Sequence, residues 1–111
     1  MTEKNLKYLS DILMAIQLIE DFTKGITDFN SYDQDRKTQS AVERQLAIIG
    51  EALNQLRKSE SGFQIESDKQ IVALRNRLVH AYDSIDNSIV WVIISKHLTP
   101  LKIEVEKLIV E

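Results

Sequence analysis

Apolar residues recur every three or four positions through most of this chain, a spacing that places them on one face of a helix. The first apolar stripe ends just before Gly25, so we expect a helix over about residues 4–24. A second stripe predicts a helix over about residues 32–58, with Ser31 as its cap and Gln34 completing a capping box. Three neighbouring acids suit that helix N-terminus better than they suit a metal ion: Asp28, Asp33 and Asp35.

Two further helices are expected beyond a polar loop. The loop spans Arg57–Glu66, and its apolar residues Phe63 and Ile65 would anchor it to the core. Ser67 opens a second capping box, and the segment that follows it again has apolar residues at helical spacing. Asp86 is a suitable cap for the next helix, because it follows a short break in that pattern.

The segment Ile89–Ile94 is ambiguous, because its β-branched residues would also suit a buried strand. The sequence offers such a strand no partner, so we expect a helix that is buried on most sides. Thr99 then precedes Pro100, which is the arrangement of a cap and the first residue of a last helix. We therefore predict an all-α, single-domain bundle of about five helices over residues 1–111.

The composition agrees with a helical domain and excludes several classes of site. Three glycines and one proline leave little turn chemistry for a multi-stranded sheet. The absence of cysteine excludes disulfides and thiolate metal sites, and two histidines without an HExxH motif make zinc a weak candidate, so we expect neither a metal nor a cofactor. The longest apolar run is Ile89–Ile94, too short to cross a bilayer. The polar N-terminus does not resemble a signal peptide, so we expect a cytoplasmic protein.

The candidate chemistry gathers in one stretch, RNRLVHAY, which runs from Arg75 to Tyr82. The net charge of −3 argues against a long surface that follows nucleic-acid phosphates. The charge is uneven, however, since residues 1–35 hold seven acids against three bases, whereas residues 69–82 hold three bases and no acid. A small positive site on an acidic body suits a localised phosphate contact.

Two residues of this stretch could cleave RNA without a metal. His80 titrates near neutral pH and could take the proton from a ribose 2′-hydroxyl, while Arg75 could stabilise the charge on the phosphorane. The expected product end is a 2′,3′-cyclic phosphate. In a straight helix the two side chains diverge by about 140°. Either the helix ends near His80, or a second copy of the chain brings its own motif across a two-fold axis.

Each candidate residue also has a purely structural interpretation. A lone histidine near an apolar stripe is commonly a satisfied structural residue, and His97 should close the fourth helix, where the helix dipole favours it. Asp11 is either a boundary residue at the edge of the core or a partner for a base in the motif. Glu51 is either an exposed glutamate or a carboxylate that holds a motif arginine. Gly50, placed in mid-helix, suggests the close approach of another backbone.

Two segments resemble a known family. Arg75, His80 and Tyr82 within RNRLVHAY match the signature of HepT-like toxins of the HEPN superfamily, and SAVERQLAIIGEAL, residues 40–53, resembles the family's second-helix segment. The resemblance covers most of the chain. It implies an all-α HEPN-like domain that forms a homodimer. It also implies a toxin ribonuclease, independent of metal, with Arg75 and His80 from both copies in a composite site.

The resemblance further implies partners and supporting residues. Asn76 and Arg77 would assist phosphate binding, and Glu51 would act as a positioning residue. The partner would be an MntA-type nucleotidyltransferase antitoxin that adds AMP to Tyr82. Such a phosphate would occupy the anion site and repel RNA. One alternative is a non-catalytic helical module that binds a nucleotide or docks a nucleotidyltransferase. Another is a structural dimer whose arginines form only ion pairs, with Glu51 and Asp11.

Overall fold

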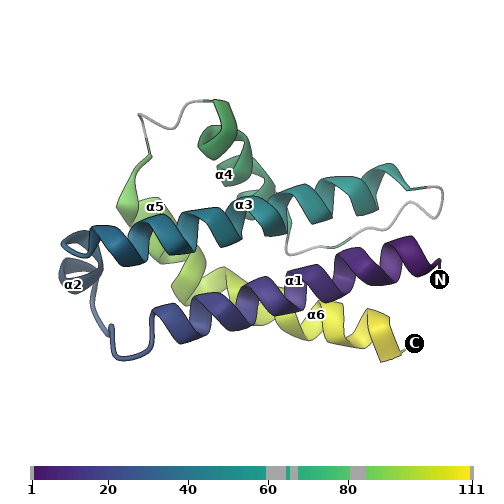
Figure 1. Ribbon diagram of the computed structural model, residues 1–111, viewed down its shortest axis with the longest axis horizontal. Coiled ribbons are helices and arrows are strands. Elements are labelled where there is room, and N and C mark those ends of the chain that lie inside the picture. The colour runs from purple at the N-terminus through teal and green to yellow at the C-terminus, as the bar shows by residue number, and fades with distance from the viewer. Residues whose placement is uncertain (1, 60–64, 66–67, 81–84, 111) are drawn as a thin grey trace.

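The computed structural model describes residues 2–59, 65, 68–80 and 85–110, and for residues 79 and 80 it describes the backbone alone. Every regular element in these ranges is helical, which confirms the all-α prediction (Figure 1). The predicted roles of Phe63, Ser67 and Tyr82 lie outside the described residues. The elements are α1 (Glu3–Phe22), α2 (Phe29–Asp33), α3 (Arg36–Lys58), α4 (Lys69–His80), α5 (Asn87–Val92), the π-helix η3 (Ile93–His97) and α6 (Leu98–Val110).

The first helix has the extent that its apolar stripe predicts, but the prediction of a cap at Ser31 is wrong. α1 is followed by Gly25, which turns the chain at φ 88°. Two aspartates then divide the next segment. The Asp28 carboxylate accepts the Ser31 N–H at 2.8 Å and caps the short α2, so Ser31 lies inside that helix. The Asp35 carboxylate accepts the Thr38 N–H at 3.0 Å and caps α3. Carboxylates satisfy the free N–H groups and also favour the positive end of the helix dipole.

Residues 87–110 form one continuous helical stretch, which departs from the prediction in two ways. The ambiguous segment is helical and Asp86 caps it as expected, but Ile89 and Val92 are exposed, so it is not buried on most sides. Thr99 is not a cap, because α6 has already begun at Leu98. Pro100 has no N–H to donate and its ring crowds the carbonyl four residues back. That carbonyl lies in η3, whose wider turn accommodates the ring.

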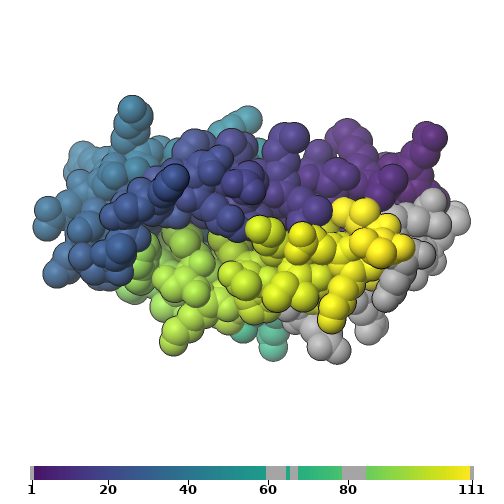
Figure 2. Space-filling model, turned by 90° about the horizontal axis from the view of Figure 1, so that it is seen from below, coloured from purple at the N-terminus to yellow at the C-terminus, as the bar shows by residue number. Residues whose placement is uncertain are grey.

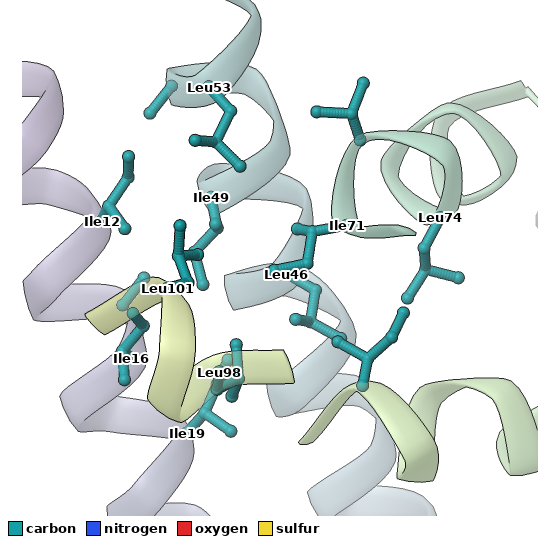
Figure 3. Close-up of a cluster of buried hydrophobic side chains, with 14 of the residues drawn as sticks. Ile12, Ile16, Ile19, Leu46, Ile49, Leu53, Ile71, Leu74, Leu98 and Leu101 are labelled. Atoms are coloured by element: carbon teal, nitrogen blue, oxygen red, sulfur yellow. The ribbon is translucent and has the colours of Figure 1, made fainter. Parts of the chain in front are cut away.

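The core lies where α1, α3, α4 and α6 meet, and it is built from the apolar stripes (Figure 3). α1 packs along α3 and against α6, while α4 packs across α3. Figure 1 shows that the C-terminal end of α4 projects away from the two long helices α1 and α3. The opposite face of the molecule is formed by α1 and α6 with α5 beside them (Figure 2). None of the described helices combines the length and apolar content that crossing a membrane requires.

Candidate functional site

The site is built where α4 crosses α3, and Gly50 makes the crossing possible. A Cβ atom built on Gly50 would overlap the Cβ of Arg75 and lie 2.6 Å from its Cγ. It would also lie 3.5 Å from the carbonyl oxygen of Ile71, so the backbone of α4 is indeed close. Any larger residue at position 50 would occupy the space of the Arg75 Cβ and Cγ atoms. The glycine therefore allows this end of the Arg75 side chain to lie directly on α3.

Glu51, the next residue on α3, holds the other end of the same side chain. The Arg75 Nη2 donates to Glu51 Oε2 in an ion pair. Nη1 donates to the side-chain oxygen of Asn76 at 3.1 Å, and Glu51 Oε1 accepts from Gln55 at 2.9 Å. The Arg75 side chain is 21% exposed and that of Glu51 46%, so the pair lies at the protein surface. The guanidinium is therefore fixed in direction and still reachable from solvent.

This ion pair lies in an open groove between α3 and α4, with a volume of about 490 Å³. The groove has two guanidinium groups, those of Arg44 and Arg75, and two carboxylates, those of Glu43 and Glu51. Burial raises the pKa of the Glu43 carboxyl above its usual range. The remaining lining residues are apolar: Ala47, Ile48 and Leu78.

Arg77 faces a different groove. It follows Arg75 by two positions, about 200° further around the helix. It lines a groove of about 420 Å³ between α4 and the α5–η3 stretch, together with His97 and mainly apolar residues. Hydrogen bonds from Ser88 lower the pKa of the Asp86 carboxyl, and the charge of Arg77 lowers it further. The structure thus brings Asn76 to the Arg75 guanidinium but separates Arg77 from it.

The structure also tests the interpretations of Asp11 and the prediction for His97. Asp11 accepts from Lys7 at 3.2 Å on the exposed side of α1, so it is a boundary residue and not a partner of a described motif base. His97 closes η3 as expected, but the helix continues into α6. The favourable helix C-terminus that was predicted there does not exist.

The two remaining signature positions are placed only in part. α4 is helical without interruption up to His80, and residues 81–84 lie outside the described residues, so both predicted solutions stay predictions. The His80 side chain and Tyr82 lie outside the described residues. Their roles stay predictions, as do the catalytic role of Arg75 and the phosphate-binding roles of Asn76 and Arg77.

Sequence reasoning missed two residues of the groove, Glu43 and Arg44. A signal for Arg44 was present, because it precedes Glu51 by seven positions and therefore lies on the same face of α3. The described part of the chain holds no group of three or more histidine, aspartate or glutamate side chains that could bind a metal ion. The chemistry that the described groove offers is recognition of an anion by arginine, with carboxylates that orient the arginine or oppose the anion.

Comparison with known proteins matches the chain to proteins described as ribonucleases, whose substrate is an anion. The family described as "Ribonuclease HepT-like" matches residues 12–108. The chain is 38% identical over 102 residues to the "Probable ribonuclease HepT" of Thermococcus cleftensis, covering 91% of this chain and 92% of that protein. It is 35% identical over 108 residues to a protein of Methanocaldococcus jannaschii whose name proposes an RNase, covering 96% and 98%. A protein of Caldanaerobacter subterraneus with a similar name is 31% identical over 104 residues, covering 92% and 91%. No solved structure matches the chain.

Proposed function

Because this chain belongs to the HepT-like ribonuclease family, we propose that it is a toxin-type ribonuclease that cleaves RNA without a metal. The observation that carries the proposal is the Arg75 guanidinium, held by Glu51 at the edge of an open groove. A fixed and partly exposed guanidinium is suited to binding a phosphate in the transition state, because it needs little reorganisation when charge develops. The family match supplies the substrate class.

The proposed reaction uses the ribose as its own nucleophile. The imidazole of His80 takes the proton from the 2′-hydroxyl, and the 2′-oxygen attacks the adjacent phosphorus. Arg75 stabilises the additional negative charge on the phosphorane. The bond from phosphorus to the 5′-oxygen then breaks, and that oxygen takes a proton from water, while the His80 imidazolium returns its proton to the solvent. One product ends in a 2′,3′-cyclic phosphate and the other begins with a 5′-hydroxyl.

We place this site between two copies of the chain. A two-fold axis close to the crossing of α3 and α4 would bring each motif against its own copy. The projecting end of α4 and the open, partly apolar groove beside it support this arrangement (Figure 1). A chain of 111 residues also gains from sharing apolar surface with a second copy, because small domains bury a limited fraction of their surface.

The proposed partner is an MntA-type nucleotidyltransferase antitoxin that adds AMP to Tyr82, with both proteins in the cytoplasm. An added phosphate close to Arg75 in sequence would compete with RNA phosphate for the arginine. Incubation with the cognate transferase and ATP should add the mass of AMP to the wild-type chain and not to a Tyr82→Phe variant. Equal modification of the variant would show that another residue accepts AMP.

A second candidate function is a helical module that binds a nucleotide or docks a nucleotidyltransferase without cleaving RNA. The net charge of −3 and the two carboxylates in the groove favour it, because both oppose a polyanion. This candidate predicts nucleotide or partner binding with no RNA cleavage at any protein concentration. A purely structural role for the Arg75–Glu51 pair would instead be contradicted by a phosphate bound between the Arg75 residues of two chains.

Growth arrest provides the test in cells. Expression of the chain alone should arrest growth and degrade RNA, and His80→Ala should abolish both effects. His97→Ala is the matched control, since His97 is the other of the chain's two histidines and lines the groove of Arg77, not the groove of Arg75. If His80→Ala is as toxic as the parent, the ribonuclease proposal fails.

A further inference from the structure

We infer that Arg44 of α3 is a second RNA-binding residue, which holds a phosphate that flanks the one being cleaved. The inference rests on the proposed ribonuclease function and adds a residue that lies outside the RNRLVHAY motif. Arg44 lines the same groove as Arg75 but comes from the opposite wall. A single RNA strand lying in the groove would therefore meet guanidinium groups from both helices.

The spacing along α3 separates the two contacts by a useful distance. Arg44 precedes Glu51 by seven positions, so it lies on the same helix face about 10 Å away along the axis. Ala47 and Ile48 line the groove between these two positions and carry no charge. Arg75 rests on α3 at Gly50, beside Glu51. The phosphate bound by Arg44 would thus be a neighbour of the phosphate bound by Arg75 and not the same one.

Arg44 balances the negative charge of the carboxylates in the groove, which would otherwise oppose the binding of RNA. Its side chain is exposed and forms no ion pair with the acids that the structure describes, whereas Arg75 is already paired with Glu51. With both arginines the groove has two positive and two negative groups. Without Arg44 it would have one arginine against two carboxylates, which would repel a polyanion. An unpaired guanidinium offers all five of its N–H donors to a phosphate.

The experiment measures binding of a fluorescent single-stranded RNA to the His80→Ala variant, so that the RNA stays intact, over a range of salt concentrations. Arg44→Ala in this background should weaken binding at least several-fold and lower the salt slope by about 0.7, the loss expected for one phosphate contact on a single strand. Arg44→Lys should restore much of the slope. Arg36→Ala is the matched control, because Arg36 is an exposed arginine of α3 outside the groove, and it should leave the slope unchanged.

Four further outcomes separate this inference from the proposed function. In the active protein, Arg44→Ala should lower kcat/KM mainly through KM, with unchanged helix content and Tm. If the wild type cleaves RNA but Arg44→Ala binds it with the same slope, the inference about Arg44 fails alone. If Arg44→Ala changes the molar mass in solution and not the slope, Arg44 belongs to a subunit contact and the inference is overturned. If the wild type neither binds nor cleaves RNA, the proposed function fails, and the inference about Arg44 fails with it.

Discussion

At the scale of single residues, the site depends on one glycine and the arginine that lies over it. Gly50 gives space to the base of the Arg75 side chain, and Glu51 fixes its end. The close contact at Gly50 could be expected from the sequence, because a mid-helix glycine costs stability. For Glu51 the residues left two interpretations open, and only the family resemblance favoured a positioning role. The sequence could not identify Arg44 as a better candidate for RNA binding than the other exposed arginines, since no residue near it indicates that α4 crosses α3 at this place.

Replacement of Gly50 by alanine tests whether α4 can cross α3 only when residue 50 has no side chain. Overpacking commonly costs about 1–3 kcal/mol, which should outweigh the roughly 1 kcal/mol that alanine gains within a helix. The free energy of unfolding, measured with urea, should therefore fall. In an Arg75→Gly background the same change should cost less, because the colliding atoms are gone. An equal cost in both backgrounds would show that the contact does not limit the crossing.

The effect of burial on the Glu43 carboxyl can be tested by measuring the stability of the protein at different pH values. Burial raises the pKa of its carboxyl in the folded state, so the folded protein binds this proton more tightly than the unfolded chain does. The stability from this group is complete below the unfolded pKa, about 4.3, and is lost as the pH rises through the folded pKa. Glu43→Gln should therefore raise Tm at pH 7 and have little effect near pH 3. Glu106→Gln, on the exposed side of α6, should change neither, and a lowered Tm for Glu43→Gln at pH 7 would contradict the account.

At the scale of elements, the long helices were predictable, whereas the separate short helix α2 and several helix ends were not. The apolar stripes identify α1 and α3 because those helices supply much of the core. The cap at Ser31 was wrong because Asp28 and Asp35 offered carboxylates at competing positions. Thr99–Pro100 predicts a helix start, yet a π turn allows the helix to continue through the proline. Such choices depend on packing, which local signals do not contain.

The cap at Asp35 can be tested with two substitutions. Asp35→Ala should lower Tm at pH 7, because α3 loses the acceptor for the Thr38 N–H. Asp35→Asn, which keeps an acceptor, should lower it less. The hydrogen bonds from Thr38 lower the pKa of this carboxyl, so its contribution is present above the unfolded pKa, about 4, and is lost as the pH falls through the folded value. An equal Tm for the wild type and Asp35→Ala at pH 7 would show that this cap is not needed.

At the scale of the whole molecule, the proposed site requires two copies of the chain. The fold presents Arg75 in an open groove beside the projecting end of α4, and a symmetric pair could close this groove into a shared cleft (Figure 1). The sequence could suggest this arrangement only through helical geometry and the family resemblance. No periodicity within one chain specifies the surface against which a second copy packs.

Mixing two inactive variants tests whether the site is shared. Arg75→Ala and His80→Ala should each be inactive alone. If Arg75 of one chain acts with His80 of the other, mixed dimers regain one intact site, and an equal mixture after subunit exchange should recover about a quarter of wild-type activity. The wild type mixed with either variant serves as the control for exchange. No recovery despite demonstrated exchange would place both residues of a working site in one chain.

The central claim is that Arg75 and His80 cleave RNA without a metal, and the most direct measurement is the 3′ end left on a defined RNA incubated in EDTA. The wild type is expected to produce fragments that end in a 2′,3′-cyclic phosphate, and the Arg75→Ala and His80→Ala variants are expected to leave the RNA intact. Cleavage that requires an added divalent metal, or cyclic-phosphate ends that persist in His80→Ala, would contradict the account.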